Sequence, residues 1–202
     1  MKSNIRILEI DGWLIYILST ILYGFLSFSI NYAFISDNLY YQSFGEQIAL
    51  ERIDKIIEFS GKWEWASYAV LPIIIIIRVF YTSVFLFIGI FFTELKADFS
   101  KLFKIALLAD FVYVLAGLVK LVILIFFREV NTLQDLQFQP LSAMELFNTR
   151  TIDPLFVYPL SLLNVFELGY FMLLAWLLVG VVYEAKEERT LRFGQSLKLV
   201  TA

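Results

Sequence analysis

Cysteine and histidine are both absent from the 202-residue sequence, and their absence excludes several kinds of site. Disulfides, thiol nucleophiles and iron–sulfur clusters need cysteine, histidine-bound haem needs histidine, and the usual zinc sites need one or both of these residues. Charged residues are also scarce, at 17 %, and the net charge is only −3. So small a charge does not favour nucleic acid as a partner. We therefore expect this chain to bind no metal, no haem and no other cofactor.

Long hydrophobic runs take the place of charge in this sequence. Hydrophobic residues make up 60 % of the chain and the mean hydropathy is +0.77, whereas soluble domains are nearer half apolar. A helix needs about 20 apolar residues to cross about 30 Å of hydrocarbon. Four runs exceed this length: residues 12–35, 66–92, 102–127 and 155–183. The sequence therefore predicts one domain, residues 1–202, folded as an all-α polytopic transmembrane helical bundle.

The first run shares only its position with a signal peptide. It is longer than the apolar region of a signal peptide, and the segment SDNLYYQ behind it contains no cleavage site of the small-x-small type. We expect the run to be retained as the first membrane helix.

Two long connections, residues 36–65 and 128–154, are predicted to lie on the same side of the membrane. Within the first, residues 44–59 have helical periodicity, with isoleucines on one side and charges on the other. This predicts a helix that lies in the membrane interface or packs across the mouth of the bundle. Trp63 and Trp65 follow and are predicted interface anchors. The long connections carry five Lys and Arg residues, whereas the shorter segments on the other side carry nine. The positive-inside rule then predicts a cytoplasmic N-terminus and external long connections.

Ionisable side chains lie inside the predicted spans, although each costs about 2.5–3.5 kcal/mol at a helix centre. They are Arg78, Asp110, Lys120 and Glu167. Counted along their spans, Arg78 and Glu167 lie about 18 Å and Asp110 about 12 Å from one end, which places all three in the middle third. Lys120 lies about 10 Å from the outer end, where its ammonium can snorkel to the interface. Arg78 thus has two candidate partners, Asp110 and Glu167.

Each predicted span carries one polar or small stripe at helical spacing, which is typical of membrane helices that associate through hydrogen bonds. Arg78, Tyr81 and Thr82, for example, share a face of the second span. We therefore predict an intramembrane polar network of eight residues: Arg78, Asp110, Lys120, Glu167, Asn31, Asn164, Tyr81 and Thr82.

Three hydrophobic segments with characteristic loop spacing, GKWEWASYAVLPIIIIIRVFYTSVFLFIG, ELKADFSKLFKIALLADFVYVLAGLVK and PLSLLNVFELGYFMLLAWLLVGV, resemble the Yip-domain family of small multi-pass membrane proteins. The tail RTLRFGQSLKLV resembles the stretch before that family's fifth helix, so the resemblance implies a fifth span missing from this sequence. Eukaryotic members carry a long cytosolic N-terminal region associated with Rab-type GTPase binding, and an Asp-Leu-Tyr-Gly-Pro motif. Both are absent here, so GTPase binding is not expected. Bacterial members are similar in architecture, which implies the bacterial inner membrane.

No nucleophile–base pair or phosphate-binding loop is visible, so we expect no catalysis. In one interpretation, two cations and two carboxylates cancel and hold the bundle of a non-catalytic subunit or scaffold, whose partners are the lipid bilayer and other membrane subunits. In the alternative, Asp110 and Glu167 serve a small transporter or a proton- or ion-coupled component. A third hypothesis is a lipid-interacting protein whose cationic groups hold a headgroup.

Overall fold

The computed structural model describes residues 10–92, 97–146 and 153–200, with side chains for all of these except 145, 146, 154, 157, 158 and 183–200. The described chain forms seven α-helices and two 3₁₀ turns: α2 (Gly12–Phe34), α3 (Asp37–Phe44), α4 (Leu50–Phe91), α5 (Phe99–Ala109), α6 (Phe111–Phe126), η1 (Leu133–Gln137), η2 (Ala143–Leu146), α7 (Pro154–Leu162) and α8 (Val165–Val200). Four stretches are long and apolar enough to cross a membrane: Gly12–Phe34, Leu50–Phe91, Phe99–Phe126 and Val165–Val182. The predicted all-α polytopic bundle is confirmed, and the chain is a multi-pass integral membrane protein.

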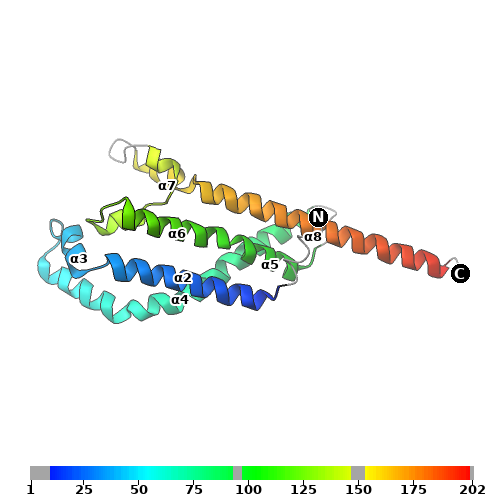
Figure 1. The fold of residues 1–202 in the computed structure, drawn as a ribbon, viewed down its shortest axis with the longest axis horizontal. Coiled ribbons are helices and arrows are strands. Elements are labelled where there is room, and N and C mark those ends of the chain that lie inside the picture. Colours follow the sequence, from blue (N-terminus) through cyan, green and yellow to red (C-terminus); the bar gives the residue numbers. More distant parts are fainter. Residues whose placement is uncertain (1–9, 93–96, 147–152, 201–202) are drawn as a thin grey trace.

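Helices α5 and α6 form one span that lies at the centre of the bundle and packs against α2, α4 and α8 (Figure 1). The core is densest on α5, where Leu102, Ile105, Ala106, Leu107 and Ala109 are all buried. The outward faces of the spans stay apolar and exposed, as the hydrocarbon of a bilayer requires.

The middle of α2 marks the centre of the bundle. Tyr23 is the middle residue of this 23-residue helix, and its hydroxyl donates to the backbone carbonyl of Asp110 at 3.2 Å. Half the hydrocarbon thickness, about 15 Å, corresponds to about ten helical residues on either side of this level. Depths below are counted from this level, here called the bundle centre. The side of the membrane that carries α3 and the connection after α6 is called the loop side.

Helix α4 is much longer than the predicted second span. Its 42 residues extend about 63 Å at 1.5 Å per residue, about twice the hydrocarbon thickness. The prediction of a separate helix at residues 44–59 is wrong, because α4 begins at Leu50 and runs unbroken into the span. Nothing terminates the helix, since residues 50–71 contain no proline. Trp63 and Trp65 are exposed on α4, about 20 Å from Arg78 along the helix, a distance that suits the interfacial zone.

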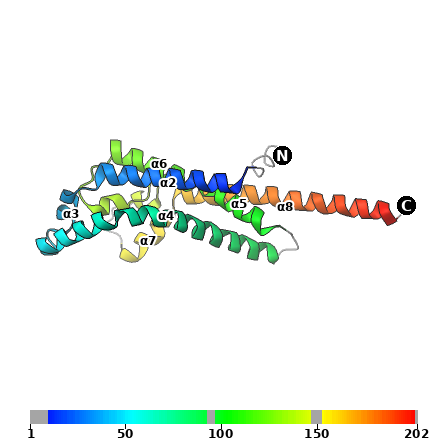
Figure 2. The same cartoon turned by 90° about the horizontal axis from the view of Figure 1, so that it is seen from below.

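Helix α4 also changes direction partway along its course (Figure 2). Pro72 lies inside the helix, and an internal proline removes one backbone hydrogen bond and is a usual cause of such a bend. The carbonyl of Pro72 accepts a hydrogen bond from the Tyr16 hydroxyl at 3.2 Å, which ties the middle of α4 to α2.

The predicted fourth span, residues 155–183, is broken into α7 and α8. Gly169 lies beside Val112, with 3.7 Å between a Cβ built on the glycine and Cγ1 of the valine. Because Val112 is only two residues from Asp110, α8 begins at Val165 about 9 Å from the bundle centre. That is inside the hydrocarbon layer. In both views α7 lies between the start of α8 and the end that carries α3 (Figures 1 and 2).

Backbone groups at this break are paired, as they must be away from water. The amide of Ala143 donates to the carbonyl of Leu163 at 2.7 Å, and the amide of Val165 donates to the carbonyl of Leu141 at 3.3 Å. Asn164 caps α8, since its side-chain oxygen accepts from the amide of Glu167 at 2.8 Å. The sequence 159–167 contains no glycine that would have signalled a helix end, and this explains why the break was not predicted.

Helices α2 and α6 approach closely at Gly117, where an added Cβ would lie 2.8 Å from Cδ1 of the buried Leu26. We expect overpacking to leave Gly117→Ala about 1–3 kcal/mol less stable to unfolding than a glycine-to-alanine variant without such a close approach. The matched control is Gly24→Ala on α2, where nothing lies within 4 Å and alanine is the better helix former by about 1 kcal/mol. Detergent-induced unfolding of both variants measures the difference, and equal effects would contradict the close approach.

Candidate functional site

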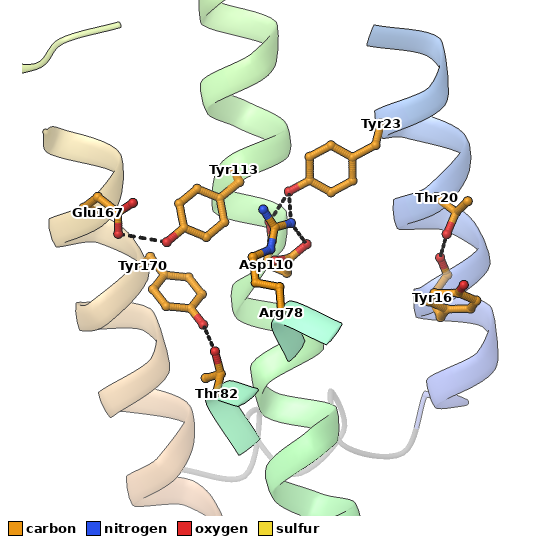
Figure 3. A network of polar contacts seen from close by, with 9 residues as sticks. All are labelled: Tyr16, Thr20, Tyr23, Arg78, Thr82, Asp110, Tyr113, Glu167 and Tyr170. Carbon is orange, nitrogen blue, oxygen red and sulfur yellow. Dashed lines mark hydrogen bonds and ion pairs between the residues drawn. The ribbon is translucent and has the colours of Figure 1, made fainter. Parts of the chain in front are cut away.

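An ion pair between α4 and the α5–α6 span lies at the bundle centre (Figure 3). Nη2 of Arg78 lies 2.7 Å from Oδ2 of Asp110, and the same nitrogen donates to the Tyr23 hydroxyl at 2.8 Å. Asp110 is 1 % exposed, so its carboxylate is shielded from surrounding solvent or lipid. Sequence reasoning left two partners open for Arg78, and the structure pairs it with Asp110.

The position of Asp110 follows from a break between α5 and α6. Asp110 is the C-cap residue of α5, and the amide of Tyr113 donates to its carbonyl at 3.0 Å, which forms a tighter i→i+3 turn. The same carbonyl also accepts the hydroxyl of Tyr23. The break therefore lets one residue present both its carboxylate and its carbonyl to side chains from neighbouring helices.

Two aromatic rings flank the cation of Arg78. Its guanidinium carbon lies 5.3 Å from the ring centroid of Tyr23 and 4.9 Å from that of Tyr113. Cations are attracted to the faces of aromatic rings, more strongly when both are removed from water. Among the described residues Nε of Arg78 has no hydrogen-bond partner although it is buried. The rings thus stabilise a cation whose hydrogen bonds all come from one end of its guanidinium.

Glu167 pairs with Tyr113 and not with Arg78, the partner that the sequence suggested. The hydroxyl of Tyr113 donates to Oε2 of Glu167 at 2.8 Å. Glu167 lies in the first turn of α8 rather than deep within a long helix, where the helix dipole favours a carboxylate. The break before α8 nevertheless keeps this residue near the bundle centre.

One further contact completes the link to α8. The hydroxyls of Thr82 and Tyr170 lie 3.0 Å apart, and the rings of Tyr170 and Tyr113 lie 4.9 Å apart between centroids. The network that the structure forms therefore includes Tyr23 from α2, Arg78 and Thr82 from α4, Asp110 and Tyr113 from the central span, and Glu167 and Tyr170 from α8 (Figure 3). We call these seven residues the central network.

Four predicted network residues lie elsewhere. Tyr81 is 60 % exposed and faces outward. Its position three residues after Arg78 had suggested a shared face, but the rotation of α4 turns Tyr81 away from the bundle. Asn31 donates to Glu64 and to the Tyr68 hydroxyl, at 2.8 and 3.2 Å, nearer the loop side. Asn164 caps α8, and Lys120 contacts an aromatic ring beyond α6. The eight-residue network is therefore corrected to the central network and these separate sites.

Three tyrosines of the central network were missing from the predicted set. Tyr23, Tyr113 and Tyr170 each join a charged or hydroxyl group to another helix. A signal existed for Tyr23, which lies three residues after Thr20 and so falls on the polar stripe of the first span.

The arrangement is suited to holding helices more than to moving protons. Arg78 and Asp110 cancel each other's charge, and Glu167 is held by a separate hydroxyl. Within the described residues, the link between Tyr113 and Arg78 is a ring-face contact, not a hydrogen bond. A proton passing from Glu167 to Asp110 would have to cross that contact.

The chain has no match among known proteins that would assign a role to this network: no family model matches it, and neither does any curated protein or solved structure.

Proposed function

We propose that this membrane protein is a non-catalytic subunit or scaffold of a larger assembly in the bacterial inner membrane. The observation that carries the proposal is the central network, which ties all four spans together through a charge-neutral ion pair and tyrosine hydroxyls. Such a network stabilises one fixed arrangement of helices, and a fixed arrangement is what a scaffold needs.

The long helices support the same proposal. Helix α4 extends beyond the hydrocarbon on the loop side, and α8 continues to Val200, well past the apolar stretch that ends at Val182. Near the start of α4, Leu50 and Phe59 are exposed, and exposed apolar and aromatic side chains outside the hydrocarbon are candidates for burial in a protein interface. In this proposal the N-terminus is cytoplasmic, the loop side is external, and the topology is Yip-like.

Extraction of the tagged protein in native lipid discs, followed by native electrophoresis and mass spectrometry, tests the assembly. We expect a defined complex that dissociates when Phe59→Glu disrupts the exposed face of α4. Glu58→Gln is the matched control, because it alters the neighbouring position without adding charge to that face, and the complex should survive it. Migration of the parent protein as a single chain without partners would refute the proposal.

A transport function is favoured by one observation, the broken fourth span with Glu167 beside the break. Discontinuous membrane helices are common where transporters bind ions. Flux assays in proteoliposomes decide between the two functions. Proton- or ion-coupled flux that is lost in Glu167→Gln would replace the scaffold proposal, whereas absence of flux in the parent protein removes the transport alternative.

A further inference from the structure

Two cations that sequence reasoning treated separately meet on one aromatic ring. Nζ of Lys120 lies 5.6 Å from the ring centroid of Phe138, and Cζ of Arg128 lies 4.4 Å from the same centroid. Lys120 belongs to α6, Arg128 follows the end of that helix, and Phe138 follows η1. The chain folds back after α6. Both positive charges therefore lie within 5.6 Å of the centre of the Phe138 ring and close to each other.

Within the part of the chain that the structure describes, neither Lys120 nor Arg128 forms an ion pair with a carboxylate. Asp135 is the acidic residue whose carboxylate interacts electrostatically with Arg128. Burial raises the pKa of Asp135, but hydrogen bonds from Thr132 and Asn131 and the charge of Arg128 outweigh it, so this pKa lies below its ordinary value. The carboxylate already accepts three hydrogen bonds, from two amides and a hydroxyl. Asp135 is therefore occupied, and Lys120 and Arg128 keep donors for another anion.

The level of these cations matches the phosphate layer of a bilayer. Lys120 lies about 15 Å from Asp110 along the span, at the edge of the hydrocarbon on the loop side. Arg128 follows the end of α6 and lies further out, in the headgroup zone.

We propose that Lys120, Arg128 and Phe138 form a binding site for the headgroup phosphate of an anionic phospholipid in the loop-side leaflet. The planar guanidinium of Arg128 offers two parallel donors to phosphate oxygens, while Lys120 supplies a point charge from the hydrocarbon edge. Phe138 positions both cations. The site is independent of any protein partner, and so it goes beyond the proposed scaffold function.

Spin-label spectroscopy on the full chain in phosphatidylcholine bilayers tests the site. Trace spin-labelled phosphatidylglycerol or phosphatidylcholine reports the lipid held at the protein surface. We expect the parent protein to select phosphatidylglycerol, and Lys120→Gln and Arg128→Gln each to reduce that selectivity about fivefold at the site. Lys55→Gln, which removes an exposed charge from α4 on the same side, is the matched control and should leave selectivity unchanged.

Three further measurements keep the outcome unambiguous. Lys120→Arg retains the charge and should retain selectivity, which separates loss of binding from loss of folding. Inorganic phosphate replacing chloride at equal ionic strength should not displace the lipid, and displacement would identify a free anion as the ligand and overturn the lipid assignment. The proposal is also overturned if the Lys120→Gln/Arg128→Gln double variant selects phosphatidylglycerol as well as the parent does.

Discussion

Arg78→Leu is expected to lower the free energy of unfolding by roughly 3–5 kcal/mol, because it leaves the Asp110 carboxylate buried without its partner. Asp110→Leu should cost a similar amount, since it leaves a guanidinium at the bundle centre with only Tyr23 as acceptor among the described residues. Removing both charges in Arg78→Leu/Asp110→Leu should restore most of the stability, because two apolar side chains suit a membrane interior.

A double-mutant cycle measured by detergent-induced unfolding in reconstituted bilayers yields the coupling between the two residues. Tyr81→Leu is the control, as it changes a large outward-facing side chain only three residues from Arg78 and should leave stability nearly unchanged. If the cost of the double variant equals the sum of the single costs, the ion pair does not hold the bundle together.

Leu163→Cys should react with a membrane-impermeant maleimide at least about tenfold more slowly than Gln134→Cys, because the break before α8 lies inside the hydrocarbon and the thiolate needs water to form. The chain has no native cysteine, so each variant reports one position without background. Gln134 is exposed in the connection after α6 and provides the fast reference.

Phe171→Cys is the matched slow control for this experiment. Leu163 and Phe171 are almost equally exposed in the protein, at 62 % and 61 %, so only their surroundings can make their labelling rates differ. Leu163→Cys should therefore label like Phe171→Cys. Labelling as fast as that of Gln134→Cys would place the break in water and make α7 a surface helix.

The membrane-spanning character of this chain was predictable from the sequence because it depends only on the length and apolarity of runs. The first span agrees almost residue for residue, since Asp11 caps its start with a side-chain hydrogen bond to Trp13. Where a span ends was harder to predict. Helix α4 runs on past the membrane through Gly61, because no proline separates its amphipathic start from its apolar part. Hydropathy alone marks only the apolar part.

Partner choice could not be predicted from depth. Asp110 and Glu167 both fell at the level of Arg78, and the decision depended on how the helices rotate and on the break that exposes Asp110. The predicted face with Tyr81 and Thr82 was half right, because one helical face is wide enough that an i+3 neighbour can point to lipid while an i+4 neighbour points inward. Lys120 and Arg128 meet only because the chain after α6 folds back, which local periodicity does not encode.

The contact between Tyr23 and Arg78 has a consequence for how the protein is made. Arg78 and Asp110 are 32 residues apart, so at about 5–20 residues per second the arginine is synthesised roughly 2–6 seconds before its carboxylate partner. Tyr23 belongs to a helix completed earlier and can accept from the guanidinium during that interval. Tyr23→Phe would then act on the yield of inserted protein more than on the stability of the finished bundle, and the tyrosine would serve as a temporary partner during biogenesis.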